Sequence, residues 1–227
     1  KVNHPPLLNN EKRSLHRLDS LVRKLERTNK HEAYDEIIRS QLEEGIIEPA
    51  SEKSQGKEFY LPHKCVERVN AESTKLRVVY DASAKEQSKA PSLNDCLNPG
   101  PPLQNKLWSV LVRQRSYPVS VCGDIKKAFL QVRVKACERN ALRFYWKHPG
   151  DKLVQVYRFT RALFGLTCSP FLFGGVIDQH LELWEKREPQ IVAELRKNLY
   201  VDDLLTGGTT VATTQDREEI KNDRSSE

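Results

Sequence analysis

Hydrophobic and polar positions recur along the chain in patterns that predict both helices and strands. Four stretches carry apolar residues at helical spacing: 14–27, 31–44, 103–115 and 169–184. We expect Ser14 and Ser169 to cap the first and last of these helices, because a serine hydroxyl accepts a hydrogen bond from a free amide of the first turn. Gly45 is expected to end the second helix, since glycine readily adopts the left-handed conformation that follows a helix.

Shorter apolar or alternating stretches predict strands at 59–69, 76–80, 119–122, 130–134, 141–146 and 153–159. The strand at 119–122 is expected to be buried and to end at Gly123-Asp124. Residues 198–207 are apolar on both sides of Asp202-Asp203, a pattern typical of a tight hairpin with the acidic pair at its tip. Helices and strands are mixed without regular βαβ alternation, so we expect an α+β fold.

Composition narrows the class of protein. The 227 residues are 38% hydrophobic and 30% charged, which is typical of a globular protein. No apolar run reaches the roughly 18–20 residues that a membrane span needs, and the first residues lack the features of a secretory signal. We therefore expect an intracellular protein that is neither secreted nor bound to a membrane. The five cysteines form no C-x-x-C pair, which disfavours a zinc ribbon, and the absence of Met indicates a piece of a longer chain.

Charge is distributed unevenly. The net charge is +6, but residues 61–170 alone hold 19 Lys and Arg against 8 Asp and Glu. Residues 31–60 hold 3 against 8, and residues 171–227 hold 7 against 12. A basic middle between acidic flanks suits a polyanion such as a nucleic-acid backbone. The alternative is a lysine-rich surface that only contacts solvent.

The carboxylates of Asp124, Asp202 and Asp203 stand beside apolar strands, where a buried charge is costly unless it is paired or holds a cation. If the two strands are neighbours in one sheet, these oxygens converge into a site of the kind that Mg²⁺ prefers. Two such ions clamp the attacking and leaving oxygens of a phosphoryl transfer. Alternatively, Asp124 is a helix N-cap and Asp202-Asp203 a plain turn.

The residues around these carboxylates resemble the motifs of reverse transcriptases. Four motifs occur in the order of that family: 75–83 for the fingers strand, 123–132 for the first carboxylate, 164–170 for a loop leading into a helix, and Tyr200-Val201-Asp202-Asp203 for Y-x-D-D. The resemblance covers roughly residues 30–210. Within the family, residues 61–64, 77–83 and 92–97 look most like the Pao (BEL) group of long-terminal-repeat retrotransposons.

The resemblance implies addition of deoxynucleotides to a primer 3′ end on an RNA or DNA template, with two Mg²⁺ ions or Mn²⁺ as a substitute. Asp124 and Asp202 would bind both ions, Asp203 would complete the acidic cluster, and the carbonyl of Ile125 would add a ligand. The resemblance also implies that Lys75 and Arg77 bind the triphosphate, with a further basic residue at Lys64 or Arg68. Phe129 would select the sugar, and Phe164 and Gly165 would contact nucleotide and template. Tyr200 and Val201 would support the primer end. Arg77 is alternatively a solvent-facing strand residue, and Phe129 a core residue on a short helix.

The resemblance also implies a domain organisation. Residues 1–212 would be fingers and palm, with 1–118 mainly fingers and 119–212 mainly palm, and the thumb would be missing. Residues 213–227 are highly polar and are expected to be disordered. The chain would belong to a retroelement polyprotein in a cytoplasmic particle. The alternatives are a catalytically inactive nucleic-acid-binding remnant, an RNA-dependent RNA polymerase and a metal-dependent nuclease.

Overall fold

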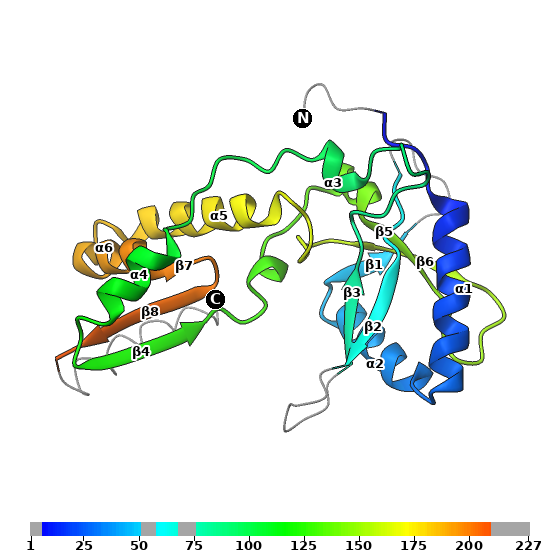
Figure 1. Ribbon diagram of the computed structural model, residues 1–227, viewed down its shortest axis with the longest axis horizontal. Coiled ribbons are helices and arrows are strands. Elements are labelled where there is room, and N and C mark those ends of the chain that lie inside the picture. Colours follow the sequence, from blue (N-terminus) through cyan, green and yellow to red (C-terminus); the bar gives the residue numbers. More distant parts are fainter. Residues whose placement is uncertain (1–5, 51–57, 68–75, 210–227) are drawn as a thin grey trace. The chain divides into compact units, whose positions relative to one another are not determined.

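The computed structural model describes residues 6–50, 58–67 and 76–209. The chain divides into two compact units, and each is built from two separate stretches (Figure 1). The first unit consists of Lys1–Asn98 and Leu130–Ser169, and the second of Pro99–Phe129 and Pro170–Glu227. The polar stretch 213–227, expected to be disordered, lies outside the described residues.

Helices α1 (Glu11–Arg27) and α2 (His31–Glu43) open the first unit, close to where their periodicity predicts them. Gly45 has φ of 64° and follows α2, as predicted. The expected cap at Ser14 is wrong, because Asn10 precedes the helix and Ser14 lies inside its first turn. The buried Ser14 hydroxyl instead donates a hydrogen bond to the carbonyl oxygen of Tyr60, 2.8 Å away.

Two antiparallel sheets complete the first unit. The larger has the order β1-β6-β5, made of Ile47–Pro49, Gln155–Phe159 and Arg143–Trp146. The smaller pairs β2 (His63–Glu67) with β3 (Leu76–Tyr80). Two short helices also belong to this unit: α3 (Leu93–Cys96) follows β3, and the 3₁₀ helix η2 (Ala136–Leu142) precedes β5. The core between the elements is strongly aromatic and includes Tyr34, Phe59, Phe144, Trp146 and Phe159.

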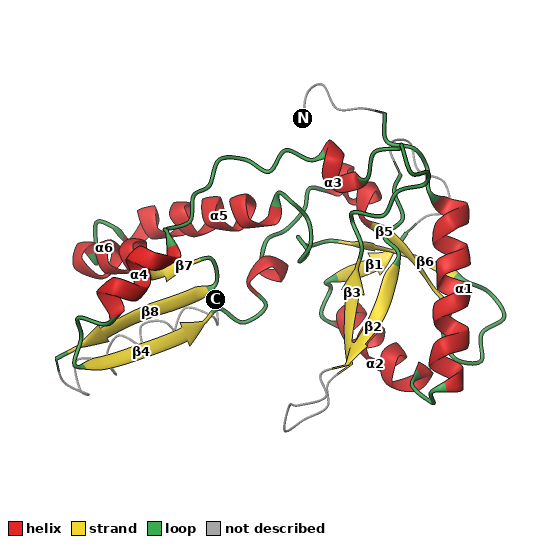
Figure 2. Cartoon of the chain, viewed as in Figure 1, coloured by secondary structure: helices red, strands yellow, loops and turns green. Residues whose placement is uncertain are grey.

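The second unit contains a three-stranded antiparallel sheet and three helices (Figure 2). The sheet has the order β4-β8-β7, made of Val119–Asp124, Asp203–Gly208 and Leu199–Tyr200. The helices are α4 (Leu107–Gln114), α5 (Ser169–Trp184) and α6 (Pro189–Asn198). Strand β8 packs against α4 and α6. No helix among the described residues has both the length and the apolar character that a membrane crossing requires.

Several sequence predictions about local structure are wrong. Ser169 is the first residue of α5 instead of its cap, and the helix predicted at 103–115 begins only at Leu107. Residues 130–134 form no strand, since the 3₁₀ helix η1 (Ala128–Gln131) occupies the start of that stretch. Strand β4 is not buried: its residues alternate between half-buried and exposed, because packed elements cover one face of its sheet.

Candidate active site on the β4–β8 sheet

The antiparallel register of β4 and β8 places Asp124 directly opposite Asp203. Directly opposed residues of an antiparallel pair project from the same face of the sheet. Just beyond this pair, the amide of Ile125 donates a hydrogen bond to the carbonyl oxygen of Asp202, 2.9 Å away. Two carboxylates far apart in sequence therefore lie side by side, as the sequence predicts if the two strands are neighbours.

The turn between β7 and β8 consists of Val201 and Asp202, since Tyr200 already pairs with Asp203. The expected tip of Asp202-Asp203 is thus displaced by one residue, and Asp203 begins a strand. Val201 has φ of 53°, an unusual conformation for a β-branched side chain. Such strained residues cost about 1–3 kcal/mol and cluster at active sites.

The carboxylates are more accessible than their apolar neighbours in sequence suggest. Asp124 and Asp203 are exposed, and Asp202 is half-buried. The expectation of costly, buried carboxylates is therefore wrong for the opposed pair, because both project from the uncovered face of the sheet. Among the described residues, no group of three or more His, Cys, Asp or Glu side chains is arranged to hold a metal ion.

Phe129 is a buried residue of η1, five positions after Asp124. Its ring meets that of Phe173 on α5 edge to face, with centroids 5.7 Å apart. The amide of Ala128 donates to the carbonyl oxygen of Ile125, so the turn leading from Asp124 into η1 is internally bonded. This position matches the alternative of a core phenylalanine on a short helix, and it also fixes the ring relative to Asp124.

Lys64 and Arg77 lie on the exposed face of the β2–β3 hairpin in the first unit. The register pairs Lys64 with Val79 and Val66 with Arg77, so all four side chains share one face. Neither cation forms a hydrogen bond or ion pair with another described residue. The other basic candidates, Lys75 and Arg68, lie outside the described residues.

The loop with Phe164 and Gly165 is held in the first unit by an asparagine that sequence reasoning missed. Phe164 is 57% exposed, and Gly165 has φ of 91°, which favours glycine. The side-chain amide of Asn94 donates to the Gly165 carbonyl oxygen (2.8 Å), and its oxygen accepts from the Thr167 amide (3.0 Å). The sequence signal was the capping box S-x-x-D that starts at Ser92 and builds α3 around Asn94.

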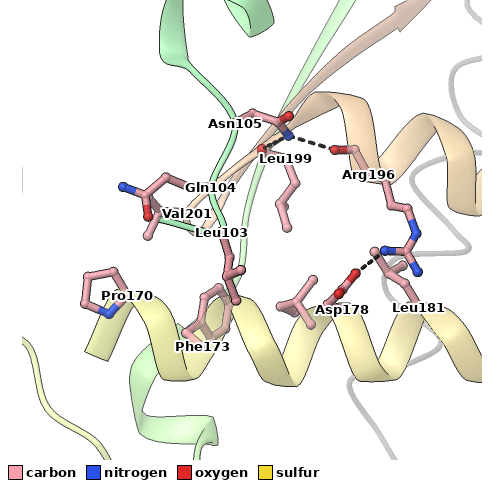
Figure 3. A pocket seen from close by; sticks show the side chains of 12 residues that line it. Leu103, Gln104, Asn105, Pro170, Phe173, Asp178, Leu181, Arg196, Leu199 and Val201 are labelled. Atoms are coloured by element: carbon pink, nitrogen blue, oxygen red, sulfur yellow. Dashed lines mark hydrogen bonds and ion pairs between the residues drawn. The ribbon is translucent and has the colours of Figure 1, made fainter. Parts of the chain in front are cut away.

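A pocket of about 180 Å³ lies beside the turn of the β7–β8 hairpin in the second unit (Figure 3). Apolar side chains of α5, together with Leu199 and Val201, form much of its wall. Asn105 donates from its side-chain amide to the carbonyl oxygens of Arg196 (2.7 Å) and Leu199 (2.8 Å). Asn105 therefore holds the backbone in place where the chain leaves α6 and enters β7. Arg196 forms an ion pair with Asp178 of α5 across the pocket.

The family model described as "Reverse transcriptase (RNA-dependent DNA polymerase)" matches residues 64–222. The chain therefore belongs to the reverse transcriptase family. Among solved structures, the crystal structure of native prototype foamy virus protease–reverse transcriptase is similar, with a TM-score of 0.56 and 17% sequence identity. The match covers 81% of this chain and 21% of that chain, so the protein spans about a fifth of its structural relative. No curated protein matches the sequence.

Proposed function

We propose that this chain carries the nucleotidyl-transfer site of an RNA-directed DNA polymerase. The observation that carries the proposal is the β4–β8 register. It places Asp124 opposite Asp203, next to the turn of the β7–β8 hairpin, within a reverse transcriptase domain. The reaction is template-directed addition of deoxynucleotides to a primer 3′ end. Its substrates are an RNA or DNA template with a primer, and deoxynucleoside triphosphates.

Asp124 and Asp202 would hold two Mg²⁺ ions, or Mn²⁺ as a substitute, with Asp203 and the carbonyl oxygen of Ile125 as further ligands. These donors are all oxygen atoms, which suits a hard divalent cation. When bound, the ions stabilise charge on the attacking 3′-hydroxyl and the leaving pyrophosphate. The backbone hydrogen bond from the Ile125 amide to the Asp202 carbonyl oxygen ties the turn that carries Asp202 to the end of β4.

The basic face of β2–β3 is the proposed triphosphate contact. Arg77 supplies a planar fork of donors that matches phosphate oxygens, and Lys75 is expected to assist it. Lys64 and Arg68 are both candidates for the further basic contact, and Lys64 shares the exposed face with Arg77. Two exposed cations that form no hydrogen bond or ion pair with another described residue are well suited to an incoming polyphosphate.

The remaining roles concern the sugar, the template and the primer end. The ring of Phe129 is held in place by Phe173, so it is suited to exclude a 2′-hydroxyl from the nucleotide site. Phe164 is exposed and Gly165 allows close approach of backbone, in keeping with contact to nucleotide and template. Tyr200 and Val201 flank the acidic turn and are proposed to support the primer end.

The motifs at 61–64, 77–83 and 92–97 further suggest a retrotransposon of the Pao (BEL) type. In that setting the chain would be one part of a retroelement polyprotein within a cytoplasmic particle. Residues 1–118 would be mainly fingers and 119–212 mainly palm. The interleaved units agree only partly with such a division, because residues 130–169 belong with the N-terminal stretch.

The test is primer extension on an RNA template with Mg²⁺ and deoxynucleotides. Asp124→Asn and Asp202→Asn should each abolish extension and leave duplex binding nearly unchanged, because only the metal ligands are altered. Asp19→Asn removes an exposed carboxylate of α1 and serves as the matched control, which should keep full activity. Extension that persists in Asp124→Asn or Asp202→Asn would contradict the assignment of the ligands.

A second candidate is a nucleic-acid-binding chain without catalytic activity. It is favoured by the lack of an arranged group of three potential ligands in the described part of the chain. Binding of primer–template that weakens steeply with salt, without extension in either Mg²⁺ or Mn²⁺, would establish this alternative.

A further inference from the structure

Two arginines of the first unit face each other outside the named strands. Arg133 and Arg161 form an isolated antiparallel bridge. Two backbone hydrogen bonds flank this bridge, from the Val134 amide to the Thr160 oxygen (2.8 Å) and from the Ala162 amide to the Val132 oxygen (2.9 Å). This pattern defines a non-hydrogen-bonded pair, in which Cα atoms are only about 4.5 Å apart and side chains are closest. Both guanidinium groups therefore leave the backbone on the same face.

Neither guanidinium is neutralised by a described residue through a hydrogen bond or an ion pair. Arg139, whose charge acts on Arg161, is itself paired with Glu48 at 3.1 Å, and Glu48 also pairs with Arg158 at 2.7 Å. Burial lowers the pKa of Arg161, and the positive charges of Arg133 and Arg139 lower it further. Like charges directly opposite each other are destabilising, so this pair lacks a counter-charge.

We propose that Arg133 and Arg161 together bind the sugar–phosphate backbone of a nucleic acid. A phosphodiester between two guanidinium groups removes their mutual repulsion and accepts paired hydrogen bonds from each fork. Arg133 is exposed and Arg161 half-buried, so a backbone phosphate has access to the pair. A nucleic acid is favoured as the source of the phosphate because the pair lies in the basic segment 61–170.

The position of the pair along the chain supports the same partner. Arg161 stands three residues before Phe164, and Arg133 stands four residues after Phe129. Both neighbours belong to the proposed nucleotide and template contacts. The inference rests on the proposed function, since it assigns additional backbone contacts to the same polymerase.

The experiment measures binding of a fluorescein-labelled primer–template duplex by anisotropy, between about 0.05 and 0.3 M NaCl. The variant is Arg133→Gln/Arg161→Gln in the full chain. Loss of two phosphate contacts should reduce the slope of log K against log salt by about 1.8, and weaken binding at 0.1 M salt by roughly 10- to 60-fold. Arg133→Lys/Arg161→Lys should keep most of the slope, because charge is preserved, while still losing affinity through the missing fork geometry.

The matched control is Lys12→Gln/Arg23→Gln, which removes the same charge from two exposed positions of α1. Wild-type slope and affinity in this control, together with the reduced slope in the arginine variant, support the site. Equal slopes in both double variants overturn the inference and leave the proposed function standing. Failure of the wild-type chain to bind the duplex overturns both.

Circular dichroism of each variant shows whether it is folded. If the double variant is unfolded, the single variant Arg133→Gln is measured in its place, since substitution of the exposed Arg133 should not disturb the fold. Its slope should fall by about 0.9, and an unchanged slope overturns the assignment.

Discussion

His63 should make the stability of the first unit sensitive to acid. The ring is buried, and its two nitrogens face different partners: Nδ1 lies 2.6 Å from the Tyr34 hydroxyl and Nε2 lies 2.9 Å from the Tyr145 carbonyl oxygen. A carbonyl only accepts, so Nε2 carries the proton and donates, and Nδ1 accepts from Tyr34. The neutral ring is thus fully satisfied, whereas a second proton on Nδ1 would oppose the tyrosine donor.

The magnitude follows from the pKa of His63, which burial lowers from 6.5 to about 4. A difference of roughly 2.5 units between unfolded and folded states corresponds to about 3.4 kcal/mol. Below pH 6.5 the unfolded state binds the additional proton, so stability rises with pH. The contribution is complete above about pH 6.5 and is lost as the pH falls through the folded pKa of about 4.

The assay is urea unfolding of the full chain between pH 7.5 and pH 4.5, followed by circular dichroism, for the wild type and His63→Gln. The glutamine amide keeps a donor and an acceptor but does not titrate. It should cost about 1–3 kcal/mol at neutral pH and flatten the acid dependence. A histidine resonance that titrates near pH 6.5 and disappears in His63→Gln would refute the reasoning, as would identical pH slopes for both proteins.

Asp35 needs separate treatment because it also responds to acid. Burial raises the pKa of Asp35, but hydrogen bonds from Trp146, Arg39 and His148 lower it on balance. A carboxylate with a lowered pKa also contributes stability that is lost as the pH falls. Comparison with His63→Gln isolates the histidine, since Asp35 is present in both proteins.

Two further substitutions test the candidate site. Phe129→Ala should raise incorporation of ribonucleotides and cost about 3–5 kcal/mol of stability, because it opens the sugar position and removes a buried ring. Phe173→Ala removes the support of the Phe129 ring but leaves that ring present, so it should destabilise the chain and relax sugar selection less than Phe129→Ala does; equal selectivity of both variants in primer extension would remove Phe129 from that role. Asn105→Ala should lower stability by about 1–3 kcal/mol and speed amide exchange around the hairpin, because two carbonyl oxygens lose their donor. Gln104→Ala, at an exposed neighbour, should leave thermal unfolding and exchange unchanged, and similar protection in both variants would contradict the positioning role.

The sequence predicted the parts of the site that depend on regular pairing. An apolar strand ending in Asp124 and an apolar hairpin around Asp202-Asp203 were enough to predict neighbouring strands, and the register confirms this. Sequence could not predict the exact turn, because moving it by one residue changes no hydrophobic position. It also could not predict that one face of β4 is uncovered, since burial depends on which helices pack against that sheet.

Other wrong predictions come from local sequence patterns that are compatible with more than one secondary structure. Leu130, Val132 and Val134 alternate as in a strand, yet the chain forms a 3₁₀ helix followed by an isolated bridge. Helix α6 was missed because its ten residues mix charged and apolar side chains without a strong start signal apart from Pro189. Serine commonly caps helices, but the Ser14 hydroxyl donates to the carbonyl oxygen of Tyr60, 46 residues away, and no local sequence pattern reveals that partner.

The interleaving of the two units has a consequence for folding during synthesis. Ile47 of β1 pairs with Phe159 of β6, about 110 residues later in the chain. At the usual pace of translation, about 5–20 residues per second, β1 waits for its partner for roughly 5–20 s. Strand β4 likewise emerges long before β8, which completes its sheet. We therefore expect nascent chains to expose apolar strand edges for seconds, and to depend on chaperones until residue 208 has left the ribosome.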